Sequence, residues 1–201
     1  MRTGLRQLDP VESAGLFRRL LAAASEPGRV ERLEAGDLPP VALVPLVLAD
    51  LDTTIHVELD DAGLRQAVLD TTGAREEGPD AEMVVSDRPR PELISALSIG
   101  STLAPERGCR LVLACTGLEA VDPAVGARER QGRAVRTLLR LRGPGISGPR
   151  ELLVTGIAAD VFEALAGRNS SFPAGIDTCL VTPSGDAVMI PRSTGLVAEE
   201  G

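Results

Sequence analysis

Apolar and polar positions follow a helical period over the first predicted helix. Asp9 can cap this helix, Pro10 suits its first turn, and Glu12 stands where a capping box places an acid. The segment 25–28, Ser-Glu-Pro-Gly, ends it. Apolar residues recur at steps of three and four and predict one apolar face, made of Val11, Ala14, Phe17, Leu20, Leu21 and Ala24.

Helical and β-branched segments alternate along the next 140 residues. A buried helix is predicted over residues 41–51, where Pro45 must lie in the first turn or kink the helix. Three more helices are predicted, over residues 62–73, 91–98 and 158–166. Strands are predicted over residues 29–33, 53–59, 81–86, 110–115, 135–141 and 151–157. Residues 122–132 are charged and contain glycine, which indicates a loop.

A β-hairpin is predicted near the C-terminal end, where two apolar runs flank the turn at residues 182–186. Its second run stops at Pro191. The order of elements, with alternating helices and strands first and hairpins later, predicts an α/β fold with a mixed sheet. We expect one domain over residues 1–201, of which residues 196–201 are frayed.

The composition argues against nucleic acid as a partner. The net charge is −8, and the chain has three Phe and no Tyr or Trp. A phosphate-binding face needs basic residues, and base stacking needs aromatic rings. All 21 basic residues are arginine, so no lysine amine is present for a Schiff base or a Walker motif.

The chain is expected to be cytoplasmic and to have no membrane segment. Its first ten residues lack the apolar stretch of a signal peptide, and no apolar run approaches 18 residues. Cys109, Cys115 and Cys179 form no C-x-x-C pair, so free thiols, buried at Cys115 and Cys179, in a reducing compartment are expected.

Two motifs suggest chemistry that the surrounding sequence does not support. Residues 143–148 match G-x-G-x-x-G, but a strand-like run follows, and Pro144 has no amide to donate to a pyrophosphate. A rigid turn is the better interpretation. His56 is the single histidine and lies among apolar neighbours, which favours a structural role over catalysis or zinc binding.

Six residues are candidates for ligand binding. Asp50 and Asp52 stand two apart at the start of a predicted strand and would point the same way. They could bind Mg²⁺ or exchange protons, or they could simply face solvent. Arg192, with the hydroxyls of Ser193 and Thr194, could form a clamp for an oxyanion. The alternative for Arg192 is a structural ion pair with Asp177, the sixth candidate. No residue is predicted to be catalytic, and no metal site is predicted.

An ordered set of segments carries a family resemblance. It comprises Asp9-Pro10-Val11, Phe17-Arg18, Leu20-Leu21, Pro27-Gly28, Leu48-Ala49-Asp50, Asp52-Thr53, Ala81, Gly100, Pro105-Glu106, Gly108, Gly143-Pro144-Gly145-Ile146, Phe172-Pro173, Gly175-Ile176-Asp177 and Ile190-Pro191-Arg192-Ser193-Thr194. Together these segments resemble the PhnH family, whose members are components of the carbon–phosphorus lyase core complex, over about residues 5–195.

This resemblance implies a fold and a role. The fold would be a three-layer mixed sheet similar to the large domain of pyridoxal-phosphate-dependent transferases, without the cofactor. Members are homodimers that join sister subunits G, I and J. The complex couples the ribose of MgATP to an alkylphosphonate, so MgATP is a substrate of the complex and not a cofactor of this chain. The resemblance therefore implies an accessory subunit of phosphonate breakdown.

Two other functions stay open at this point. The chain could be a free-standing enzyme that uses a transferase-like cleft, although the missing lysine and the single histidine argue against this. It could also be a pure assembly scaffold without a ligand site.

Overall fold

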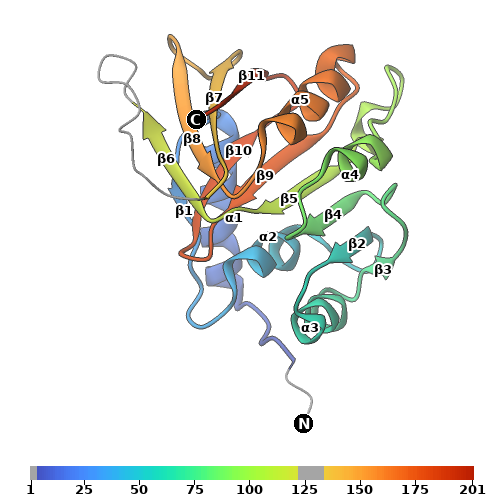
Figure 1. Cartoon of the computed structure of the whole chain (residues 1–201). Helices are drawn as coiled ribbons and strands as arrows, with labels where there is room; N and C mark the ends of the chain where they lie inside the picture. Colours follow the sequence, from blue (N-terminus) through green and yellow to red (C-terminus); the bar gives the residue numbers. More distant parts are fainter. Residues whose placement is uncertain (1–3, 122–133) are drawn as a thin grey trace.

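Within residues 4–121 and 134–201, which this computed structural model describes, seven strands form the larger sheet (Figure 1). Their order is β1-β10-β9-β5-β4-β2-β3. The strands β2 to β5 and β9 are parallel in their pairings, and β10 and β1 extend one edge in antiparallel fashion. The bounds are β1 Glu31–Arg32, β2 Thr54–Glu58, β3 Arg75–Glu76, β4 Met83–Ser86, β5 Arg110–Ala114, β9 Asp177–Val181 and β10 Asp186–Ile190.

A second, antiparallel sheet has the order β11-β7-β8-β6 (Figure 1). Its strands are β6 Gly117–Val121, β7 Arg136–Arg142, β8 Arg150–Thr155 and β11 Gly195–Glu200. The expectation that residues 196–201 are frayed is wrong, because β11 pairs along its whole length with β7. The glycine-rich segment 143–148 joins β7 to β8, as its interpretation as a turn requires. The predicted loop over residues 122–132 lies outside the described residues.

The five predicted α-helices are confirmed, with bounds α1 Pro10–Ser25, α2 Pro40–Leu48, α3 Ala62–Thr72, α4 Pro91–Ala96 and α5 Ala159–Arg168. Two short 3-10 turns, η1 Pro105–Arg107 and η2 Asn169–Ser171, complete the described elements. Pro45 lies inside α2. Gly73 ends α3 in the left-handed conformation that glycine adopts at low cost.

Apolar layers cover both faces of the larger sheet. One face packs against α1, α2 and α3, and the other packs against α4, α5 and the smaller sheet. Side chains along β5 alternate between the two faces of the sheet. Leu111 and Leu113 face α4, α5 and the smaller sheet, whereas Val112 faces α1, α2 and α3. The prediction of an α/β fold with a mixed sheet is therefore confirmed, although a separate antiparallel sheet was not foreseen.

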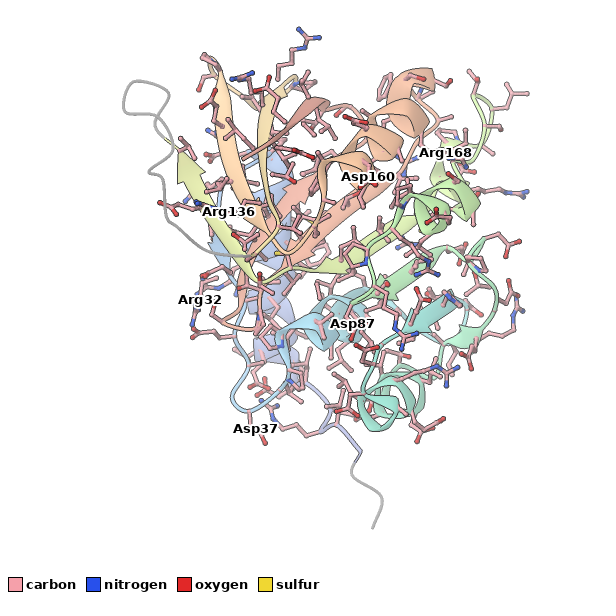
Figure 2. The ribbon with its side chains drawn as sticks, viewed as in Figure 1. Arg32, Asp37, Asp87, Arg136, Asp160 and Arg168 are labelled. Carbon is pink, nitrogen blue, oxygen red and sulfur yellow. The ribbon has the colours of Figure 1, made fainter. Side chains whose placement is uncertain are left out.

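The end of α5 is tied to α4 by a side chain. Arg168, which closes α5, extends toward α4, and its Nη2 donates to the carbonyl oxygen of Leu97 (Figure 2). This bond uses one of the carbonyl groups that a helix end leaves without an intrahelical partner. It holds two helices together on the face of the sheet that also carries β11.

The buried face of α1 differs from the predicted one. Leu16, Leu20 and Ala23 are buried, whereas Val11, Phe17 and Leu21 are 79%, 44% and 50% exposed. The helix is apolar around much of its circumference, so periodicity alone could not decide which side docks on the sheet. The exposed side leaves a row of apolar side chains facing solvent, defined here as the α1 outer row: Val11, Ala14, Phe17 and Leu21.

The start of α1 is fastened as its sequence predicts. Asp9 Oδ1 accepts from the backbone N–H groups of Val11 and Glu12 at 2.8 and 2.9 Å, and Glu12 Oε2 accepts from the Asp9 N–H at 3.2 Å. Arg6 donates from both terminal nitrogens to Glu12, at 2.6 and 2.7 Å. These contacts, the Arg6 hydrogen bond above all and then the backbone bond from Asp9, lower the pKa of Glu12 to about 2.

This lowered pKa predicts a pH dependence of stability. The carboxylate contributes in full above its ordinary pKa of 4.5, and the contribution is lost as the pH falls toward about 2. We expect Glu12→Gln to lower the free energy of unfolding near neutral pH and to have little effect near pH 2. Denaturant titrations of both proteins across this range measure the difference. An equal difference at every pH would contradict the assignment.

Candidate functional site

An ion pair joins the first residue of β9 to the residue that follows Pro191. Arg192 donates from Nε and Nη2 to Oδ2 of Asp177 at 3.1 and 2.6 Å. Its backbone N–H donates to Oδ1 at 2.8 Å. The structural ion pair, which the sequence left open as an alternative to an oxyanion clamp, is therefore the observed arrangement. Ligand binding by these two residues stays a prediction.

The Arg192 side chain also braces the segment 99–108, here called the 99–108 loop. Its Nη1 donates to the carbonyl oxygen of Pro105. The backbone N–H of Gly175 donates to the Ile99 oxygen at 2.8 Å, which fastens the start of the loop. Near its tip, Leu103 is 97% exposed. An anion would have to compete with Asp177 and Pro105 for Arg192, whose side chain is 13% exposed.

The two hydroxyl candidates next to Arg192 have different surroundings, and ligand binding by them stays a prediction. Thr194 is buried, its backbone N–H donates to the Pro191 oxygen at 2.8 Å, and its hydroxyl finds no hydrogen-bond partner among the described residues. Ser193 lies against the turn between β7 and β8, where its carbonyl oxygen is 3.0 Å from the position that a Cβ on Gly143 would take. The turn after β10 thus serves packing between the two sheets.

The two aspartates of the other candidate pair have separate surroundings. They precede β2 in a turn and not within the strand, so the expected alignment on one face of a strand is wrong. Asp50 Oδ1 accepts from the Thr53 hydroxyl at 2.9 Å and from the backbone N–H groups of Asp52 and Thr53 at 3.1 and 3.2 Å. These bonds lower the pKa of Asp50 and shape the entrance to β2. Asp52 is exposed.

A pocket of about 350 Å³ opens beside the ion pair, on the face of the larger sheet that α1 and α2 cover. Its floor is the adjacent row Val112, Cys179 and Met189 on β5, β9 and β10. Its walls include Ala24 of α1 and Val44 and Leu48 of α2, and its edge carries Arg110, Asp177 and Pro191. The volume lies near the lower end of small-molecule sites, and a mostly apolar lining with a few polar groups is typical of them.

Arg110 is the functional candidate that sequence reasoning missed. It begins β5 and pairs in register with Asp177, so both side chains leave the same face of the sheet. Asp177 is turned to Arg192, and within the described chain the Arg110 guanidinium makes no hydrogen bond or ion pair. It does contribute to the lowered pKa of Asp50. The only sequence signal was an arginine at the start of an apolar strand.

The carboxyl ends of β2 and β4 are a second location to consider, since ligands often bind where strand order reverses in such sheets. There Asp87 (labelled in Figure 2) accepts through Oδ2 from the backbone N–H of Asp60 at 2.8 Å. Arg88 pairs with the Asp60 carboxylate. The other oxygen of Asp87, Oδ1, is buried and finds no hydrogen-bond partner among the described residues. No group of three or more potential metal-ligating side chains is found in the part of the chain that the structure describes.

The remaining reactive residues have structural surroundings. His56 Nδ1 lies 3.1 Å from the carbonyl oxygen of Glu77, the residue that follows the neighbouring strand β3. This contact fits the structural role that the sequence predicts for His56. Cys109, Cys115 and Cys179 are free and buried, as expected for Cys115 and Cys179. Burial raises the pKa of each thiol to about 12, so all three are protonated at neutral pH. These surroundings leave Arg110 and the apolar pocket beside it as the candidate binding site.

Comparison with known proteins adds two matches. Residues 7–197 match a family model described as bacterial phosphonate metabolism protein (PhnH). The chain is also similar to the putative C-P lyase subunit protein HtxG of Stutzerimonas stutzeri, at 30% identity over 187 residues, which covers 89% of this chain and 82% of that protein. Among the described helices, none has both the length and the apolar character needed to span a bilayer.

Proposed function

This chain belongs to the PhnH family of bacterial phosphonate metabolism proteins, and from that membership we propose that it is a subunit of a carbon–phosphorus lyase. The observation that carries the proposal is the match over residues 7–197, together with a relative of similar length that is named as a lyase subunit. The match includes the ion pair, the 99–108 loop and the residues that line the pocket.

Within the lyase we assign the chain an accessory role, in the step that couples an alkylphosphonate to the ribose of ATP. MgATP would be a substrate of the whole complex, and this chain would hold no cofactor of its own. Two properties of the sequence support a role without covalent chemistry. It has no lysine for an aldimine, and it has a single histidine.

The proposed fold relationship is to the large domain of pyridoxal-phosphate-dependent transferases. The parallel run β9-β5-β4-β2-β3, with helices on both faces, supports an α/β ancestry of this kind. Without a lysine, the inherited scaffold would serve assembly and ligand binding instead of aldimine chemistry.

The proposed partners are a second copy of this chain and the sister subunits G, I and J, in the cytoplasm. Exposed apolar side chains support association, because large apolar groups facing water mark interaction surfaces when they cluster. The α1 outer row is such a cluster. The 99–108 loop adds a single apolar side chain, Leu103, which is almost fully exposed on a loop that Arg192 braces.

The experiment is co-expression of this chain with the three sister subunits, followed by size-exclusion chromatography with light scattering. We expect a dimer for the chain alone and one larger particle with the partners. Leu103→Asp should leave the lone chain folded and lower its affinity for the sister subunits about tenfold, because an interface anchor is lost. Leu51→Asp is the control, since Leu51 is likewise strongly exposed, at 79%, but lies in the turn before β2.

Two results would count against the proposal. Elution of the chain apart from all three sister subunits would exclude a stable subunit role. Turnover of alkylphosphonate and ATP by the purified chain alone would favour the free-standing enzyme. A complex that forms normally but whose chain binds no ligand would support the scaffold.

A further inference from the structure

The edge of the pocket beside the Arg192–Asp177 pair carries an arginine, Arg110, that makes no direct hydrogen bond or ion pair among the described residues. Asp177 is neutralised by Arg192, whose Nη2 lies 2.6 Å from Oδ2. Asp50 Oδ1 accepts from the Thr53 hydroxyl, which is the main cause of its lowered pKa, and from the backbone N–H of Asp52, and Arg110 adds only a smaller electrostatic contribution to that pKa. Arg110 is left as a partly buried cation without a hydrogen bond or ion pair among the described residues.

Such an arginine is unusual in a protein with this many acids. The sequence has 29 Asp and Glu against 21 Arg, and nine of the described arginines form an ion pair with an acid. Arg18, Arg19 and Arg107 also lack a side-chain partner among the described residues, but they are exposed, whereas Arg110 is partly buried. A guanidinium has five N–H donors in a planar fork that matches an oxyanion. Where those donors border an apolar pocket, an anionic group on a ligand would satisfy them.

The rest of the pocket specifies the other end of the ligand. Val112, Cys179 and Met189 form an apolar floor, and Val44 and Leu48 form an apolar wall. Cys179 adds no charge, because burial raises the pKa of its thiol to about 12. An aliphatic chain of a few carbons would displace water from this surface, whereas a second charge would find no partner there.

We propose that this pocket is a binding site for a small organic anion with a short aliphatic chain. The anionic group lies at Arg110, and the chain lies on the floor between α1 and α2. The inference rests on the proposed function only for the choice of a phosphonate as one probe. A carboxylate with the same aliphatic chain also carries an anionic group that could bind Arg110, so both headgroups are tested.

The probes are methyl-, propyl- and pentylphosphonate, the carboxylates butyrate and hexanoate, and neutral pentanol, titrated into the full chain by calorimetry. We expect each added methylene to tighten binding about fourfold until the pocket is filled. Arg110→Gln should weaken binding of both anions about tenfold or more and leave that of pentanol nearly unchanged. Tighter phosphonate binding would point to the lyase substrate, and tighter carboxylate binding to a carboxylic acid.

A second variant tests the apolar part. Ala24→Phe places a ring into the pocket from α1 and should remove the dependence on chain length. The matched controls are Arg18→Gln and Ala62→Phe, because both residues are exposed and neither lines the pocket. All variants should keep the circular dichroism of the parent.

Three outcomes would overturn the proposal. They are no binding of any anion at millimolar concentration, equal binding by the parent and Arg110→Gln, and an affinity that does not change with chain length. None of them would bear on the subunit role, which co-purification with the sister subunits tests separately.

Discussion

Replacing Arg192 with alanine is expected to lower the free energy of unfolding by about 3 kcal/mol, the scale of a mostly buried ion pair that loses one partner. The variant leaves the Asp177 carboxylate without its cation and frees the Pro105 carbonyl. Asp177 is 30% exposed, so water offsets part of the loss, and the value lies at the low end of that scale. Denaturant titration of the parent and the variant measures it.

The control for this prediction is Arg88→Ala. Arg88 also pairs with an aspartate, Asp60, but the two side chains are 55% and 74% exposed. An exposed pair contributes less than about 1 kcal/mol. Hydrogen exchange should also quicken at Gly175 in Arg192→Ala, since its N–H bond to Ile99 depends on the braced loop. If the two arginine variants were equally stable, the bracing role would be wrong.

Gly108→Ala is expected to cost about 3 kcal/mol as well, for a steric reason. A Cβ at Gly108 would lie 2.2 Å from the carbonyl oxygen of Gly175, 2.6 Å from Arg192 Nη1 and 3.0 Å from the oxygen of Ile99. The backbone at this position has φ −70°, so the conformation itself is open to any residue. The cost arises because two main-chain oxygens would have to move, and with them the 99–108 loop.

Gly15→Ala is the matched control. Gly15 lies in α1, and a Cβ there would meet nothing within 4 Å. We expect this variant to be more stable than the parent by about 0.5–1 kcal/mol, because alanine loses less conformational freedom in a helix. Thermal and denaturant unfolding of both variants give the comparison. A stable Gly108→Ala protein with an unchanged loop would show that the close approach is not rigid.

The sequence predicted those features that local signals determine. The start of α1 follows from Asp9, Pro10 and Glu12, and the end of α3 follows from Gly73, because capping groups act within one helical turn. The existence and order of the helices and of most strands were predicted for the same reason. The two-residue strand β3 and the strand β6 were missed, since neither shows a run of β-branched residues.

Features that depend on distant segments could not be predicted. Residues 195–200 form β11 only because β7, more than fifty positions earlier, offers its edge. Which side of α1 is buried depends on the surface of β10 and α2 beneath it. In the site, the sequence offers the Arg192–Asp177 ion pair as an alternative to an anion clamp, because an arginine and an aspartate can always pair if the fold brings them together. Arg110 was missed because its pocket is assembled from α1, α2 and three strands.

The burial of all three cysteines gives the protein a practical property. Their thiols are enclosed and protonated at neutral pH, so maleimide reagents will react slowly with the native chain. A cysteine introduced by Leu51→Cys would be largely exposed to water, because Leu51 is 79% exposed, and it would lie outside the 99–108 loop that is proposed to contact the sister subunits. The native cysteines therefore add little background labelling when one fluorophore or spin label is attached in the turn before β2. Distances from that label could map how a lyase particle is put together.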